Sequence, residues 1–140
     1  MSGFLIDTNV ISELVRPRPD ARVKTWVASV DEDLLFLSVL TIGEIRKGIA
    51  LLPDASRRAA LEAWLDGHLA VRFDGRILPI DLRIAERWGR MAAQVAPKHQ
   101  LPVIDGLLAA TAVEHNLTFV TRNTKDVIAT GVPAFNPWVA

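Results

Sequence analysis

Short apolar runs alternate along this chain with longer stretches of helical periodicity, and no other feature constrains the fold as much. Each run is four or five residues long, which is typical of a buried strand; the runs cover residues 3–6, 34–38, 77–80 and 117–121. Pro79 within the third run favours an edge position, because proline cannot donate a hydrogen bond inside a sheet.

The segments between these runs predict amphipathic helices. Apolar residues recur at spacings of three and four over residues 23–30, 61–69 and 84–95, with Asp20 as a start signal for the first helix and Pro97 ending the third. An alanine-rich helix is predicted from about residue 105 to 115. Strands that alternate with helices predict one α/β unit, residues 1–140, with a mostly parallel sheet covered on both faces. Such sheets bind ligands beyond the carboxyl ends of their strands.

Composition narrows the class of protein. Half of the 140 residues are hydrophobic, enough for one buried core. The absence of cysteine excludes disulfides and thiolate metal sites and is compatible with the cytoplasm, where we expect the protein to lie. The first apolar run has no basic region before it and stops at Asp7, so we expect neither a signal peptide nor a membrane span.

The charges balance, with 16 basic and 16 acidic residues, which is mild evidence against a nucleic-acid partner. Setting aside Asp7, Glu44 and Asp105 as metal ligands leaves 16 basic against 13 acidic residues, a net charge of +3. Composition therefore does not decide the partner.

Those three acids lie just after predicted strands or at the start of a helix. Asp7 directly follows the first strand, Glu44 follows the second, and Asp105 opens the alanine-rich helix. Singly, each has a structural explanation. Asp7 is a good turn or N-cap residue, and Glu44 completes a capping box with Thr41. Asp105 is an acid in a first turn, favoured by the helix dipole by about 0.3–1 kcal/mol.

Together, at one edge of a parallel sheet, the same acids indicate a cation site. Two carboxylates about 4 Å apart repel by about 4 kcal/mol at an effective dielectric constant of ~20. Capping gains of about 1 kcal/mol each would not offset that repulsion. A hard divalent cation would, and Mg²⁺ and Mn²⁺ prefer oxygen ligands. With no cysteine and only three scattered histidines, a zinc site is not favoured.

Several segments of the chain match one ordered set of motifs. FLIDTNVISE at residues 4–13 resembles the opening motif of PIN-domain nucleases, and among these of VapC-type toxins. The Glu44 segment, DGLLAAT at 105–111 and FVTRNT at 119–124 resemble the remaining motifs in order and spacing. GRILP at 75–79 and FNPW at 135–138 are most similar to the FitB-like branch, and the resemblance covers nearly the whole chain.

The resemblance implies a three-layer α/β/α sandwich with one or two Mg²⁺ or Mn²⁺ ions in an acidic pocket. By motif position, Asp7 and Asp105 become the principal metal ligands, and Glu44 a third acid that binds directly or through water. Thr8 and Thr121 would orient the pocket.

Asn123 departs from the family pattern, because many PIN domains have a fourth aspartate there. An amide can accept a hydrogen bond from a metal-bound water or coordinate weakly through its carbonyl oxygen. The departure therefore affects the occupancy of a second metal site rather than activity as such. Asp126 is an acid nearby, but Asn123-x-x-Asp126 is more typical of a helix start.

The activity implied is hydrolysis of RNA phosphodiester bonds by metal-activated water, with Asp7, Glu44, Asp105 and Asn123 as the catalytic set. The partners implied are a VapB-type antitoxin and a second copy of the chain in a homodimer. Rim cations would hold the RNA, although each is more typical of an ordinary solvated charge; the candidates are Arg46, Lys47, Arg122, Lys125 and the Arg16, Arg18, Arg22 and Lys24 run. The four tryptophans mostly occupy apolar helical positions, which predicts core or interface roles.

Other classes fit less well. Haloacid-dehalogenase phosphatases need a second aspartate two residues after the first, where this chain has Asn9, and response-regulator receivers need a paired acid beside Asp7. A degenerate PIN domain that only binds a partner or RNA stays open because of Asn123. That alternative predicts no metal affinity and no effect of replacing Asp7. The RNA target is also left open.

Overall fold

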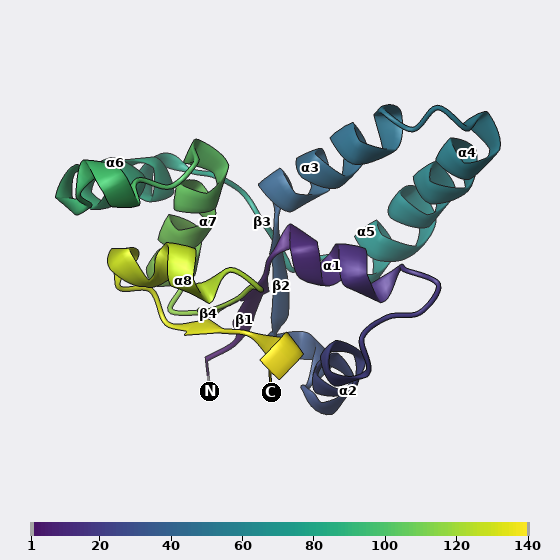
Figure 1. The fold of residues 1–140 in the computed structure, drawn as a ribbon, viewed down its shortest axis with the longest axis horizontal. Coiled ribbons are helices and arrows are strands. Elements are labelled where there is room, and N and C mark those ends of the chain that lie inside the picture. Colours follow the sequence, from purple (N-terminus) through teal and green to yellow (C-terminus); the bar gives the residue numbers. More distant parts are fainter. Residues whose placement is uncertain (1, 140) are drawn as a thin grey trace.

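The structure, a computed structural model that describes residues 2–139, is built on one five-stranded parallel sheet (Figure 1). The strand order is β3-β2-β1-β4-β5, which places β1 at the centre and β3 at an edge. Pro79 directly follows β3, so the predicted edge position is confirmed. The strands are β1 (Phe4–Ile6), β2 (Leu35–Ser38), β3 (Ile77–Leu78), β4 (Thr118–Val120) and β5 (Ala134–Phe135).

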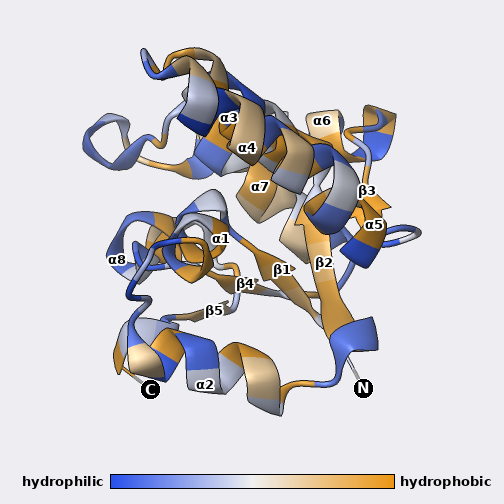
Figure 2. Ribbon diagram, turned by 90° about the vertical axis from the view of Figure 1, so that its right-hand side faces the viewer, coloured by the Kyte–Doolittle hydropathy of each residue, from blue (hydrophilic) through white to orange (hydrophobic). Residues whose placement is uncertain are grey.

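Side chains of the two central strands alternate between two apolar cores, one on each face of the sheet. Ile6 of β1 and Val120 of β4 belong to one core, whereas Leu5 and Phe119 belong to the other. Both faces are therefore apolar, and Figure 2 shows β1 and β2 in orange along most of their length. This is the pattern of a parallel sheet covered on both sides.

Helices cover both faces, so the predicted three-layer α/β/α sandwich is confirmed (Figure 1). On one face, α4, the π-helical turn η2 and α5 follow one another without leaving helical geometry. That face carries α1 (Thr8–Leu14), α2 (Ala21–Ser29), α3 (Val39–Ala50), α4 (Ala55–Trp64), η2 (Leu65–Leu69) and α5 (Ala70–Arg72). The other carries α6 (Leu82–Gln94), α7 (Val103–Glu114) and α8 (Thr124–Val127).

Short 3₁₀ turns complete the chain: η1 (Glu32–Leu34), η3 (Pro97–His99), η4 (Ile128–Thr130) and η5 (Pro137–Val139). Over residues 2–139, no helix is long and apolar enough to cross a membrane.

The long amphipathic helices match their sequence signals. Asp20 caps α2 by accepting from the backbone N–H of Arg22 at 2.8 Å, as the start signal predicts. Asp81 caps α6 in the same way, and α6 ends at Gln94, before Pro97. The alanine-rich helix α7 begins at Val103, slightly earlier than expected, which leaves Asp105 in its first turn.

Candidate active site

An open pocket of about 440 Å³ lies where β1, β2 and β4 end. Asp7, Glu44, Asp105 and Asn123 all line it, although they come from four separate segments of the chain. Three of these segments, those of Asp7, Glu44 and Asn123, follow parallel strands of the sheet, so the carboxyl-end rule locates the pocket. Asp105 joins them from the first turn of α7.

Asp7 lies at the floor of this pocket, only 8% exposed, and caps the N-terminus of α1. The backbone N–H of Thr8 donates to Asp7 Oδ1 at 2.7 Å. The Thr121 hydroxyl donates to Oδ2 at 2.7 Å, and Asn9 Nδ2 donates to the same oxygen at 3.2 Å. Asp7 is therefore the helix cap that the sequence predicts, and it is also a carboxylate held in one orientation in the pocket.

Glu44 reaches the pocket from the second turn of α3, and the predicted capping box is wrong. Ser38 caps α3, its hydroxyl accepting from the backbone N–H of Leu40 at 3.0 Å. Thr41 therefore falls inside the helix, and among residues 2–139 its buried hydroxyl finds no hydrogen-bond partner. Glu44 instead accepts a hydrogen bond from the Thr8 hydroxyl at 2.6 Å, which ties α3 to the start of α1.

Burial and mutual repulsion raise the pKa values of two of the acids. Burial raises the pKa of Asp7 from 3.8 to about 6, and the charges of Asp105 and Glu44 add to the rise. Hydrogen bonds from Thr121 and Thr8 oppose it. Burial also raises the pKa of Asp105, followed by the charges of Glu44 and Asp126. Asp7 and Asp105 are thus close enough to neighbouring acids for charge repulsion to disfavour their ionised forms.

Asn123 lies at the exposed rim of the pocket, at the N-cap position of α8, but its side chain makes no capping bond. The predicted helix start is therefore present without the side-chain cap that the spacing favours. Asp126 lies in the first turn of α8 and lines a neighbouring hollow that shares Asp105 with the main pocket.

Of the candidate RNA-binding cations, only two arginines, Arg16 and Arg122, line the main pocket. Arg46 pairs with Asp66 instead, and Lys125 lines the neighbouring hollow. Arg22 pairs with the cap residue of its own helix, α2. Arg18, Lys24 and Lys47 line neither hollow.

Sequence reasoning missed several residues of this pocket, among them Asn9 and Trp138. Asn9 is not among the predicted site residues, yet its amide bridges Asp7 and Thr121, at 3.2 and 3.3 Å. For Trp138 the sequence predicts a core or interface role; it lies in the core at 5% exposed, but it also lines the pocket. The spacing Asp7-x-Asn9 could have suggested the first role; no local signal suggests the second.

The donor set fits a hard divalent cation, although the ligands are few. Within the described residues no three Asp, Glu, His or Cys side chains are close enough to hold an ion between them. The Asp105 carboxylate makes no hydrogen bond or ion pair to any residue from 2 to 139, so both its oxygens are available. Mg²⁺ usually keeps several waters and needs only one or two carboxylates. Two aspartates and water therefore suffice.

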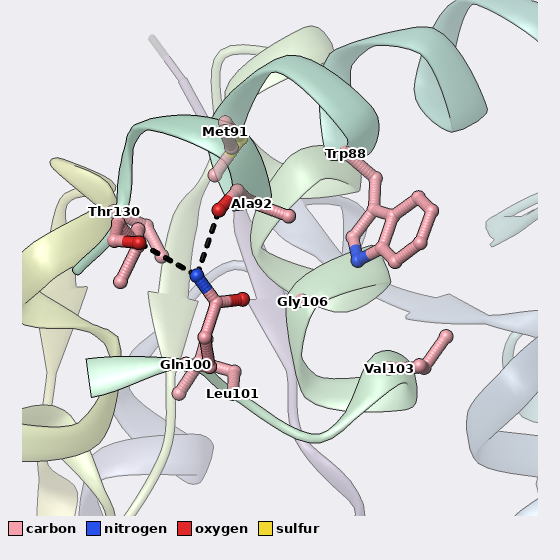
Figure 3. Close-up of a pocket in the computed structure, with 9 residues that line it drawn as sticks. Trp88, Met91, Ala92, Gln100, Leu101, Val103, Gly106 and Thr130 are labelled. Atoms are coloured by element: carbon pink, nitrogen blue, oxygen red, sulfur yellow. Dashed lines mark hydrogen bonds between the residues drawn. The ribbon is translucent and has the colours of Figure 1, made fainter. Parts of the chain in front are cut away.

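A smaller pocket, of about 110 Å³, lies between α6 and α7 (Figure 3). Its lining includes Trp88 and Met91 of α6 and contains none of the candidate site residues. Figure 3 shows the Trp88 ring beside Gly106, the residue after Asp105. A side chain on Gly106 would meet Trp88 Nε1 at 2.8 Å, so this glycine lets α7 approach α6 closely.

Comparison with known proteins places these features in a family. The PIN domain family matches residues 4–129. Toxin FitB of Neisseria gonorrhoeae is 40% identical over 137 residues, covering 96% of this chain and 98% of that protein. VapC ribonuclease Y4jK of Sinorhizobium fredii is 36% identical over 136 residues, covering 96% and 97%.

A solved structure from the same organism as the first of these relatives also matches this chain. The crystal structure of FitAcB from Neisseria gonorrhoeae superposes with a TM-score of 0.92 at 39% identity, covering 98% of this chain and 99% of that one. Sequence and fold coincide along nearly the whole chain, and the chain belongs to the PIN domain family.

Proposed function

We propose that this protein is a divalent-metal-dependent endoribonuclease and the toxin of a VapBC-type toxin–antitoxin pair. One observation carries the proposal: Asp7, Glu44 and Asp105 line a single pocket at the carboxyl edge of the sheet, where Asp7 is nine-tenths buried and its pKa is raised. The relatives named as a toxin and as a VapC ribonuclease support the same activity. PIN-domain ribonucleases generally depend on a divalent metal ion.

Asp7 and Asp105 would hold Mg²⁺ or Mn²⁺, with Glu44 in contact through water. When bound, the ion supplies Lewis-acid chemistry, acidifying water and polarising a phosphate oxygen. Thr8, Asn9 and Thr121 keep the Asp7 carboxylate in one orientation through hydrogen bonds of 2.7–3.2 Å.

Two further groups, Glu44 and Asn123, act on the attacking water. Glu44, oriented by the Thr8 hydroxyl, can accept a proton from the attacking water, and Asn123 can hold that water through its amide. If water rather than the 2′-hydroxyl attacks phosphorus, in line with the 3′-oxygen, the P–O3′ bond breaks, and the products carry 5′-phosphate and 3′-hydroxyl ends.

The expected partners are a VapB-type antitoxin, an RNA substrate and a second copy of the chain, in the cytoplasm. An apolar groove of about 230 Å³ beside Thr8 and Glu44 offers the antitoxin a surface next to the acids; it is lined chiefly by side chains of α1, α3 and α4.

The test is RNA cleavage by purified protein freed of any copurifying partner. Wild type and Asp7→Asn would be incubated with total cellular RNA in Mg²⁺, Mn²⁺ or EDTA, and the cleaved ends mapped. We expect discrete cuts that require metal and disappear in Asp7→Asn. Equal background from both proteins, with no metal binding by calorimetry, would instead identify a degenerate domain that only binds RNA or a partner.

A further inference from the structure

The acidic pocket poses an electrostatic problem for its proposed substrate. RNA carries a negative charge on every phosphate, whereas Asp7, Glu44 and Asp105 place three acids in one pocket. A strand that enters needs a cation at the pocket that is not already neutralised by a carboxylate. Among residues 2–139, two basic residues line this pocket, Arg16 and Arg122.

Of these two arginines, Arg122 is the one whose charge is not paired with a carboxylate. Arg16 is paired with Glu13, its Nη1 lying 3.2 Å from Oε1 of a carboxylate that is only 6% exposed. Arg122 forms no ion pair with any residue from 2 to 139, and its side chain is exposed to solvent.

The backbone of Arg122 is fixed to the catalytic machinery. Arg122 follows Thr121, whose hydroxyl holds Asp7. Its N–H donates to Asn9 Oδ1 at 3.4 Å, and its carbonyl oxygen accepts from Asn136 Nδ2 at 3.2 Å. The residue is thus held from both sides, one of them the C-terminal segment.

The side chain of Arg122 is held by Trp138. The guanidinium carbon lies 5.0 Å from the centre of the Trp138 ring, which is a cation–π contact. The ring is itself fixed, because Trp138 is 5% exposed and its backbone N–H donates to Asn136 Oδ1 at 2.9 Å. Stacking uses the face of the guanidinium and leaves its in-plane N–H donors free.

We propose that Arg122 binds a phosphate group of the RNA strand at the mouth of the acidic pocket, and that Trp138 is the positioning residue that holds it there. This inference rests on the proposed ribonuclease function. A planar guanidinium donates two parallel hydrogen bonds to a phosphate, and a stacked one loses less side-chain freedom on binding.

The first test measures the contribution of the Arg122 charge to RNA binding. Binding of a fluorescein-labelled single-stranded RNA oligonucleotide would be followed by anisotropy at several salt concentrations, in an Asp7→Asn background that prevents cleavage. The binding constant K falls as salt rises, and Arg122→Gln is expected to make the slope of log K against log salt shallower by about 0.7. That is the value for one phosphate contact on a single strand. Arg90→Gln removes the same charge from the exposed face of α6, outside the pocket, and should leave the slope unchanged.

The second test measures turnover with Asp7 intact. Arg122→Gln is expected to raise KM by roughly tenfold, because a charge-assisted contact is lost. Arg122→Lys keeps the charge but not the planar fork, so a smaller rise is expected. Trp138→Phe keeps a smaller ring face and should raise KM less than Trp138→Leu does. Trp138→Leu keeps an apolar side chain without a face and should raise KM severalfold.

The double variant separates positioning from simple core packing. If Trp138 acts through Arg122, Trp138→Leu adds no further rise in KM when Arg122→Gln is already present. Melting temperatures measured alongside show whether each variant is folded. Independent, additive effects of the two substitutions would overturn the positioning role.

Failure of this inference differs from failure of the proposed function. A wild type that cleaves RNA, with Arg122→Gln matching Arg90→Gln in both slope and KM, overturns the role of Arg122 alone. A wild type that cleaves nothing in Mg²⁺ or Mn²⁺ overturns the ribonuclease itself and this inference with it.

Discussion

At the scale of single residues, Asp7 occupies a position with conflicting demands on its charge. As the N-cap of α1 it is favoured as an ionised acceptor, whereas burial beside Asp105 and Glu44 favours the protonated form. Burial dominates, because the pKa of Asp7 rises to about 6. The metal-free protein therefore carries a destabilising charge at neutral pH, located where a cation would relieve it.

This conflict predicts the pH dependence of stability. Because the folded-state pKa lies above the unfolded value of 3.8, the native state binds the proton more tightly. The stability gained from the protonated form is present at low pH and is lost as pH rises from about 3.8 to about 6, a change of about 3 kcal/mol from this group. Urea unfolding in EDTA, from pH 4 to 7.5, measures it.

The matched control for that measurement is Asp7→Asn, which keeps an N-cap and removes the titration. Other carboxylates also titrate in this range, so the informative quantity is the difference between the two proteins. Asp7→Asn should become more stable than wild type as pH rises through 6. A difference that stays constant from pH 4 to 7.5 would show that Asp7 titrates normally.

Asn123 yields a second residue-scale prediction. Replacing it with aspartate adds a carboxylate at the rim of the pocket, next to acids whose pKa values are already raised. Asn123→Asp should bind Mn²⁺ roughly tenfold more tightly, because ligand charge tunes cation affinity. Isothermal titration calorimetry measures the change, with Asn123→Ala as the control. Unchanged affinity in Asn123→Asp would mean that residue 123 lies too far from the ion to matter.

At the scale of elements, predictability followed the strength of the local pattern. The amphipathic segments became α2, α4 and α6, and the alanine-rich segment became α7, whereas α1, α8 and β5 show no period of their own. The capping box failed for a local reason. Ser38 is also a good cap, so α3 starts earlier and Thr41 falls inside it.

The candidate site was predictable only in part. Strand-end acids could be placed at one edge because parallel strands share their polarity, and Asp7, Glu44 and Asp105 do line one pocket. Their role as metal ligands stays a prediction. The contacts of Asn9 with Thr121 and of Arg122 with Trp138 join segments whose packing no local pattern encodes.

Packing between α6 and α7 gives an element-scale prediction. A Cβ at Gly106 would lie 2.8 Å from Trp88 Nε1 and 2.9 Å from Cδ1, so Gly106→Ala forces the two helices or the ring apart (Figure 3). We expect a loss of about 1–3 kcal/mol in the free energy of unfolding, measured with urea. Because Asp105 precedes Gly106, RNA cleavage should fall as well.

Gly89 provides the matched control within the same helix pair. A Cβ there meets nothing within 4 Å, and the residue is exposed in α6. Gly89→Ala should raise stability by about 0.5–1 kcal/mol, since alanine is the better helix former. If both substitutions changed the free energy of unfolding equally, the Trp88 ring would be able to move aside with no loss of stability.

At the scale of the whole molecule, topology explains where the acids gather. The chain adds β2 and β3 on one side of β1 and then crosses to add β4 and β5 on the other. Ligand sites of open parallel sheets lie at the point where the strand order reverses. Here that point lies between β1 and β4, and the hydrogen bond from Thr121 to Asp7 spans it. The alternation of strands and helices predicted the parallel sheet, but no sequence pattern predicted this order.

Metal binding should therefore be coupled to the stability of the entire domain. A cation that binds only the folded protein stabilises it by about 2.7 kcal/mol at a concentration a hundredfold above its Kd. Mn²⁺ or Mg²⁺ should raise the urea midpoint of wild type at pH 7, and EDTA should reverse the rise. Asp7→Asn and Asp105→Asn should lose most of this gain. Asp74→Asn, an exposed acid outside the pocket, should keep it. A gain of equal size in all four proteins would mean that the ions bind elsewhere on the surface. The repulsion among the acids of the pocket would then need an explanation other than a bound cation.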